Sequence, residues 1–209
     1  MQGEPKLFQV LRNTLDHSKG KTISLGEIML HLKNEGLVFL VLIVALPISI
    51  PIPTPPGFTT LFGIPLCLLT FQMIYKPDSV WLPKWLATKR IDVESFLHFI
   101  DKAEPWFLKA TRFVKPRNQR FTTISFEKIV GVLALLSSIV IALPILFANA
   151  IPSISIVVMS VGLLYRDGTT VIIGMIISII GLLIAITVVT VVAFFGLEVL
   201  HKFIEYLSF

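Results

Sequence analysis

The sequence contains forty consecutive residues, Gly36 to Tyr75, without one charged side chain. The middle of this stretch, 51–57, holds four prolines and a glycine, and a continuous helix does not tolerate such a run. As a helix, 36–50 would be about 22 Å long, shorter than the roughly 30 Å hydrocarbon core of a bilayer, whereas 58–75 just suffices. The stretch therefore predicts a hairpin of two short or half-penetrating membrane helices joined by a non-helical tip.

This tip is the first candidate for a functional site. Irregular backbone at membrane depth is tolerated only where protein covers it or where it lines a water-filled cavity. The rest of the composition agrees with a membrane location, since 55% of the 209 residues are hydrophobic and only 15% are charged. The chain is therefore expected to be an integral membrane protein whose first partner is the lipid bilayer.

The charges favour a membrane topology over nucleic-acid binding. The chain has 18 Lys and Arg against 13 Asp and Glu, and the basic excess lies beside the apolar stretches, as the positive-inside rule requires. We therefore expect a cytoplasmic N-terminus, a cytoplasmic linker over 76–128 and no nucleic-acid partner. The single cysteine, Cys67, excludes a disulfide framework, and the first apolar run begins too far into the chain for a signal peptide.

Two polar segments flank the first hairpin. Residues 1–35 form an amphipathic lead-in, in which Ser24 and Glu27 fit a capping box at a helix start. The linker over 76–128 holds eleven basic residues and all three tryptophans, a composition typical of a membrane interface. Within it, apolar residues recur at helical spacing between 93 and 114, which predicts an interfacial helical pair broken near Pro105.

Two further uncharged stretches follow. Ile129–Tyr165 is 37 residues long and is again broken in its middle, by Pro144 and Pro152. Thr169–Leu197 has 29 residues, about 44 Å as a helix, so it must tilt strongly or break, most plausibly near Gly181.

The two broken stretches resemble each other. Ala45-Leu-Pro-Ile48 recurs as Ala142-Leu-Pro-Ile145, and a second proline follows in each, at Pro56 and Pro152. We interpret them as duplicated broken hairpins, a device by which transporters build a site from half-helix ends. The prediction is one all-α polytopic membrane domain over 1–209. Its parts are a lead-in (1–35), hairpin 1 (36–75), a basic linker (76–128), hairpin 2 (129–165), and a long terminal transmembrane segment with its tail (166–209).

Several motifs together resemble the ExoD family of bacterial exopolysaccharide synthesis proteins. They are Ala45-Leu-Pro, Thr54-Pro-Pro-Gly-Phe, Gly63-Ile-Pro-Leu, Gln72, Trp81-Leu-Pro-Lys-Trp, Glu104-Pro-Trp, Ala142-Leu-Pro, Asn149, Ile151-Pro and Tyr165-Arg-Asp-Gly. The resemblance covers roughly 22–200 and implies a bacterial inner-membrane protein involved in exopolysaccharide production. It implies no defined molecular activity.

The candidate site residues lie at the tips and at the margins of the apolar stretches, because no stretch contains a charge. For binding a solute they are Thr54, Pro56, Gly57, Gln72, Asn149 and Pro152. For gating or coupling they are Glu27, Glu127, Arg166 and Asp167. Five of them have a structural alternative: Glu27 caps a helix, Arg166 and Asp167 form a turn, Gln72 bonds another helix, and Asn149 caps the break beside Pro152.

Catalysis has little support in this sequence. None of the four histidines has metal-ligand spacing, and there is no nucleophile elbow, phosphate loop or carboxylate pair in an apolar cleft. We expect no catalytic residue, no cofactor and no metal site. The favoured function is a small-solute transporter or permease, a homodimer, with its site between the two tips. The alternative is a non-transporting scaffold of the exopolysaccharide machinery.

Overall fold

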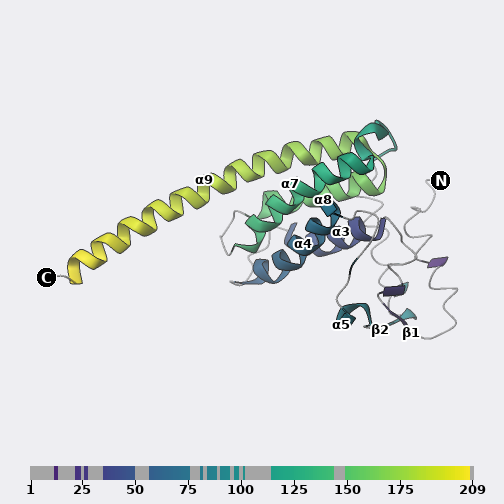
Figure 1. Cartoon of the computed structure of the whole chain (residues 1–209), viewed down its shortest axis with the longest axis horizontal. Helices are drawn as coiled ribbons and strands as arrows, with labels where there is room; N and C mark the ends of the chain where they lie inside the picture. Colours follow the sequence, from purple (N-terminus) through teal and green to yellow (C-terminus); the bar gives the residue numbers. More distant parts are fainter. Residues whose placement is uncertain are drawn as a thin grey trace.

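The computed structural model describes residues 12–13, 22–24, 26–27, 35–49, 57–75, 81, 84–88, 90–94, 97–98, 101, 114–143 and 149–207. Its helices are α3 (Glu35–Ser49), α4 (Phe58–Tyr75), α5 (Lys84–Ala87), α7 (Ile124–Ala142), α8 (Ala150–Leu164) and α9 (Gly168–Leu207) (Figure 1). A short 3-10 turn, η1 (Gln119–Thr122), precedes α7. By length and composition, α4, α7 and the first 28 residues of α9 can each cross a membrane. The predicted helical membrane fold is confirmed at this level.

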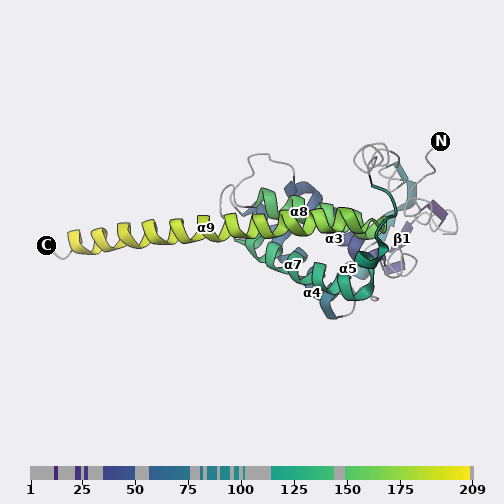
Figure 2. The same cartoon turned by 90° about the horizontal axis from the view of Figure 1, so that it is seen from above.

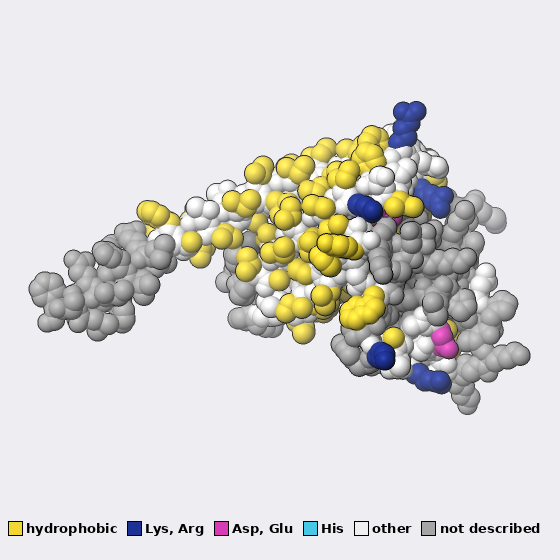
Figure 3. Space-filling model, viewed as in Figure 1, with side chains coloured by type: hydrophobic (Ala, Val, Ile, Leu, Met, Phe, Trp, Pro, Cys, Tyr) yellow, Lys and Arg dark blue, Asp and Glu magenta, His cyan; other side chains and the backbone are white. Residues whose placement is uncertain are grey.

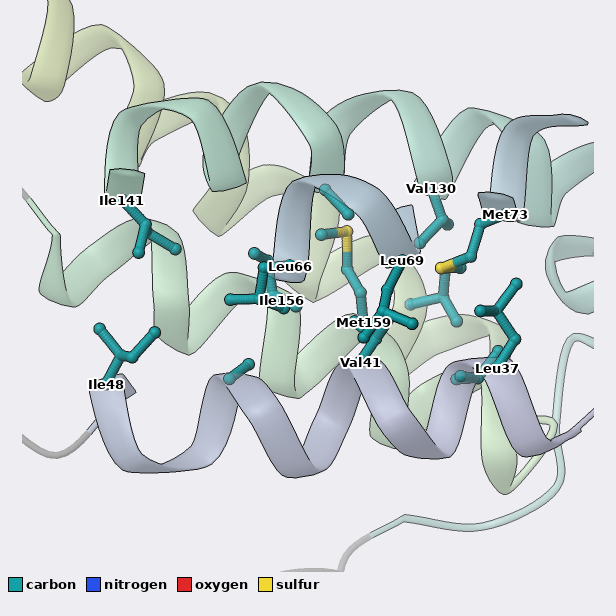
Figure 4. Packing of buried hydrophobic residues seen from close by; sticks show 14 residues of the cluster. Leu37, Val41, Ile48, Leu66, Leu69, Met73, Val130, Ile141, Ile156 and Met159 are labelled. Atoms are coloured by element: carbon teal, nitrogen blue, oxygen red, sulfur yellow. The ribbon is translucent and has the colours of Figure 1, made fainter. Parts of the chain in front are cut away.

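The membrane helices form an antiparallel bundle. α4 packs along α7 and α3 packs along α8, while α9 lies against α8 and extends well beyond the bundle (Figures 1 and 2). Buried apolar side chains from α3, α4, α7 and α8 fill the space between these helices (Figure 4). The largest of those that are almost fully buried are Leu37, Val41, Leu42, Leu66, Met73, Val130, Ile141, Ile156 and Met159.

The two short membrane helices are buried in the bundle, and the three longer ones form its outer surface. The short helices α3 and α8 have few exposed side chains, namely Leu46, Pro47 and Ile154. The three span-length helices carry rows of exposed apolar residues, which cover the face seen in Figure 3. Examples are Leu61, Ile64, Leu68 and Phe71 on α4, Val132, Leu136 and Ile139 on α7, and Ile176, Ile180 and Leu183 on α9. Helices of full span thus carry most of the surface suited to lipid.

Glycines set the closest helix contacts. A Cβ added to Gly63 on α4 would lie 2.6 Å from the backbone of Ala142 on α7, and one on Gly174 of α9 would lie 2.8 Å from the backbone N of Met159. Small residues at such crossings are typical of membrane helices, where packing and not solvent exclusion drives association. The helix backbones can therefore approach at these points only because side chains are absent.

α9 differs from the prediction of a break near Gly181. The helix is continuous from Gly168 to Leu207, and Gly181 serves instead as a contact point, because a Cβ there would lie 2.9 Å from Ile151 on α8. The uncharged stretch 169–197 therefore forms one unbroken helix, and residues 198–207 of the predicted tail continue the same helix.

A small sheet also departs from the all-α prediction. Thr22–Ser24 (β1) pairs antiparallel with Arg90–Asp92 (β2), so the lead-in is tied to the linker. The predicted capping box next to β1 is confirmed, because Glu27 Oε2 accepts hydrogen bonds from Ser24 N at 2.8 Å and Ser24 Oγ at 2.9 Å. Of the predicted interfacial helical pair, the part over 102–113 lies outside the described residues.

Candidate functional site

The broken ends of the two helix pairs, α3–α4 and α7–α8, lie at the same end of the bundle. Thr60, in the first turn of α4, donates a 2.9 Å hydrogen bond from Oγ1 to the carbonyl of Ala142, the last residue of α7. In the second contact, Ser153 Oγ of α8 lies 3.3 Å from the carbonyl of Ile48 near the end of α3, and 2.8 Å from that of Ala150. Each pair thus contributes a hydroxyl to the helix end of the other. We call this region the tip cluster: Ile48, Thr60, Ala142, Asn149 and Ser153.

Asn149 is the polar centre of the tip cluster. It is only 7% exposed, and its Nδ2 makes a long hydrogen bond of 3.5 Å to the carbonyl of Leu143. Its Oδ1 is buried and accepts no hydrogen bond from the described residues. It occupies the N-cap position of α8 but makes no side-chain cap.

Pro152 removes one of the two backbone amides that Asn149 could cap, and the backbone of Asn149 is helical (φ −90°, ψ −22°) and not extended as in an N-cap. An N-cap side chain accepts from the backbone N–H two or three residues later, and the third residue here is Pro152, which has no N–H. The sequence left two roles open for Asn149, a cap at the helix break and a contact with a solute; its side chain bonds the carbonyl of Leu143 at the end of α7 and makes no N-terminal cap on α8.

Two other described candidates for solute binding, Gly57 and Gln72, lie at opposite ends of α4. Gly57 lies at the start of α4 with a φ of +86°, a backbone conformation that suits glycine. Thr54 and Pro56 lie outside the described residues. Gln72 sits near the opposite end of α4, where its Oε1 accepts a 2.8 Å hydrogen bond from the backbone N–H of Trp81. It therefore bonds the segment that follows its own helix, and among the described residues it makes no bond to another helix.

Two of the candidate gating residues line a pocket at the other end of the bundle. The pocket has a volume of about 500 Å³. Its polar lining is Gln119, Thr122, Thr123, Glu127 and Arg166, and its apolar lining is Val38, Ile124, Leu163 and Leu164. The N-terminus of α7 thus faces the C-terminus of α8 across a hollow with one acidic and one basic side chain. Glu27, by contrast, is engaged in its capping box.

Asp167 joins the linker to the bundle. Its side chain is fully buried and accepts hydrogen bonds from Arg117 Nε at 3.0 Å, from the backbone N–H of Lys115 at 3.2 Å and from Thr170 Oγ1 at 2.8 Å. The backbone N–H of Thr169 also donates to it at 3.0 Å, so Asp167 caps α9. Burial alone would raise the pKa of Asp167, but hydrogen bonds from Arg117, Thr170 and the backbone outweigh it and hold the pKa below its ordinary value.

The turn that contains Asp167 is tight. Arg166 has a φ of 53°, and the backbone of Gly168 meets the carbonyl of Asn118 too closely for any side chain at that position. These features agree with the turn that the sequence predicts for Arg166 and Asp167. The bond from Arg117, fifty residues earlier, has no local signal in the sequence.

Buried hydroxyls inside the bundle were not singled out from the sequence. Ser137 on α7 and Ser178 on α9 are fully buried with their Oγ atoms 3.0 Å apart, and Thr70 on α4 lies 3.5 Å from Ser138 on α7. Hydroxyls between membrane helices are a recognised form of contact. Within the described part of the chain, no group of three or more His, Cys, Asp or Glu side chains is placed to hold a metal ion.

Comparison with known proteins gives a family and two relatives. The family model described as "Exopolysaccharide synthesis, ExoD" matches residues 7–187. Protein ExoD of Rhizobium meliloti (strain 1021) is 27% identical over 166 residues, which cover 78% of this chain and 68% of that protein. An uncharacterized protein of Synechocystis is 28% identical over 178 residues, covering 85% and 82%. No solved structure matches the chain.

Proposed function

Because this chain belongs to the ExoD family of exopolysaccharide synthesis proteins, we propose that it is a small-solute transporter or permease in the bacterial inner membrane that serves this synthesis. The supporting observation is a set of buried hydroxyls within a bundle whose core and outer surface are otherwise apolar. Buried hydroxyls lie on four helices between the pocket and the tip cluster: Thr70, Ser137, Ser138, Ser155, Ser160 and Ser178. These hydroxyls are the polar side chains that a path through the bundle would use.

The proposed path begins at the pocket and ends at the tip cluster. Glu127 and Arg166 give the pocket both signs of charge, so it suits a polar or zwitterionic solute better than an apolar one. Further inside, only hydroxyl, amide and backbone groups are available, which suits a small polar solute. The ancestral duplication of the broken hairpins remains a prediction, and the reciprocal contacts of Thr60 and Ser153 support it.

The orientation and assembly are also proposals. The linker and the lead-in share the sheet β1–β2, so both belong on one side, which positive-inside topology makes the cytoplasm. Both helix pairs then start from that side, and α9 ends on the other (Figure 1). We propose a homodimer, in which the second copy supplies part of the wall of the path, because a chain of 209 residues is small for a transporter.

Flux in liposomes tests the transporter. The full chain, reconstituted and loaded with a labelled monosaccharide, amino acid or sodium ion, is expected to exchange at least one of these probes. Arg166→Gln should slow the exchange, while Arg120→Gln, an exposed arginine outside the pocket lining, should leave it unchanged. Folded protein that exchanges none of the probes would refute the proposal.

A scaffold is the second candidate, because the polar segments are fixed to one end of the bundle. Arg12 pairs with Asp101 at 2.7 Å, which ties the lead-in to the linker, and Arg117 pairs with Asp167, which ties the linker to the start of α9. A scaffold predicts that charge reversal at exposed Arg120 and Lys128 abolishes exopolysaccharide production in cells, whereas Asn149→Ala has no effect. The opposite pattern favours transport.

A further inference from the structure

The pocket between the start of α7 and the end of α8 lies where the bundle meets the lipid head groups. Glu127 lies two residues before the uncharged stretch Ile129–Tyr165, and Arg166 is the first charge after it. Both side chains belong to the pocket lining. Charged residues that flank an apolar membrane stretch lie at the head-group level of the bilayer. The pocket is therefore at the depth at which a lipid head group can enter it.

One edge of the pocket continues into the lipid-facing surface of the bundle. Ile124 lines the pocket and is itself 53% exposed in the first turn of α7. The exposed side of α7 continues from there through Ile129, Val132 and Leu136. A ligand whose polar part fills the pocket can therefore lay an apolar chain along α7 without leaving the bilayer.

The pocket offers an anion both a cation and a helix N-terminus. The guanidinium of Arg166 supplies the positive charge on the side of α8. On the other side, Thr123 occupies the N-cap position of α7 but makes no side-chain cap, because its Oγ1 donates to the carbonyl of Arg120 at 3.3 Å. The first N–H groups of α7 thus receive no cap from Thr123, and they form the positive end of the helix dipole. A phosphate in the pocket is favoured by both groups.

The same pocket disfavours a ligand that carries only negative charge. Glu127 contributes a half-buried carboxylate to the lining. The hydroxyls of Thr122 and Thr123 donate their protons to the carbonyls of Gln119 and Arg120, so only their lone pairs remain for a ligand. A primary ammonium suits these acceptors, because it has three N–H donors and a positive charge. A quaternary ammonium has the charge but no N–H.

We propose that the pocket binds the head group of a zwitterionic phospholipid that carries a primary ammonium, with the acyl chains along the exposed side of α7. The volume of about 500 Å³ is that of a small-molecule site. A dissolved zwitterion would leave the apolar edge at Ile124 without a partner, which is why we assign a lipid. The binding requires only the membrane location of the chain. A role for this lipid as a competitor of the solute rests on the proposed transport.

The test is thermal unfolding of the full chain in detergent, titrated with phosphatidylethanolamine, phosphatidylcholine or phosphatidylglycerol of identical acyl chains. The melting temperature is expected to rise and saturate with phosphatidylethanolamine at a concentration about tenfold lower than with phosphatidylglycerol. A basic surface that attracts lipids by charge alone would give the opposite order. Half-saturation that is equal for the three lipids, or lowest for phosphatidylglycerol, would overturn the proposal.

The variants separate the head group from the chain. Glu127→Gln should abolish the preference for phosphatidylethanolamine over phosphatidylglycerol, whereas Arg120→Gln, at an exposed arginine outside the lining, should retain it. Ile124→Ser changes an exposed side chain and should weaken lipid binding, which keeps the test decisive even if Glu127→Gln fails to fold. A preference that survives Glu127→Gln, or lipid binding that is unchanged in Ile124→Ser, would contradict the site.

The source of the zwitterion is tested with O-phosphoethanolamine, the soluble head group. It should stabilise the chain only at higher concentrations than the lipid does. If it saturates at the same concentration, the ligand is a dissolved zwitterion and the lipid site is refuted. Preferential binding of phosphatidylethanolamine without any flux in liposomes would leave the lipid site standing and refute transport alone.

Discussion

The Thr60 hydroxyl and the Ala142 carbonyl, 82 residues apart in the chain, are joined by a hydrogen bond of 2.9 Å between the start of α4 and the end of α7. A helix leaves its last carbonyls without intrahelical partners, and in lipid water cannot replace them. The bond therefore satisfies a helix end by a side chain from the other helix pair, and Ser153 does the same for Ile48.

Replacing Thr60 with valine should destabilise the bundle. The exchange keeps the shape of the side chain and removes the donor, so a loss of ~1 kcal/mol in unfolding free energy is expected. Denaturation of the purified protein in mixed micelles measures it. Thr59→Val is the matched control, since Thr59 makes no side-chain hydrogen bond among the described residues; an equal loss in both variants would contradict this role of Thr60.

Gly63→Ala should separate α4 from α7. The added Cβ would lie 2.6 Å from the backbone N and Cα of Ala142, and backbone cannot turn aside as a flexible side chain can. The cost of such overpacking is about 1–3 kcal/mol, visible as a lower melting temperature. Ile64→Leu, at the neighbouring exposed position, should melt like the unmodified chain.

Because of Asp167, the free energy of unfolding should decrease at acid pH. Because its pKa is lowered in the folded protein, its contribution is complete above the ordinary value of 3.8 and is lost as the pH falls through the lowered pKa. Melting temperature measured from neutral to acid pH should show this loss. Asp167→Asn should be less stable by ~2 kcal/mol at neutral pH and should lack that part of the acid dependence.

The partner of Asp167 provides the control for this prediction. Arg117→Gln removes the charged donor and should reproduce part of the loss at neutral pH, whereas Arg120→Gln should not. If Asp167→Asn and the unmodified chain lose stability identically in acid, the acid dependence belongs to other groups.

Pro152→Ala should give Asn149 the capping partner that it lacks. Alanine restores the N–H at the third position of α8, and a formed cap contributes ~1 kcal/mol. We expect a higher melting temperature than that of the unmodified chain. The double variant Asn149→Ala with Pro152→Ala isolates the interaction, because the gain should vanish when the acceptor is absent.

Local signals in the sequence predicted much of the helical framework. The limits of α4 follow from Gly57 and from the first charge after Tyr75, and the capping box of Ser24 and Glu27 is a short-range motif with a defined geometry. The end of α3 and the start of α8 also follow from nearby prolines to within a few residues.

Long-range contacts could not be predicted in this way. The strands β1 and β2 have three residues each, too few for an alternating pattern, and Arg117 meets Asp167 only through the tertiary fold. Gly181 illustrates the ambiguity of a single glycine, which either breaks a helix or admits a neighbour. Here α8 packs against it, and the helix continues.

α9 is a lever arm as well as a membrane helix. Its forty residues span about 60 Å, and its first turn is held by the hydrogen bonds of Asp167. α8 packs closely against α9 at Gly174 and Gly181, and the 26 residues beyond Gly181 extend about 39 Å, so each degree of bend there displaces the far end by about 0.7 Å. Small changes in how α8 holds α9 are therefore magnified at the far end of the helix, where a label near the C-terminus would report them.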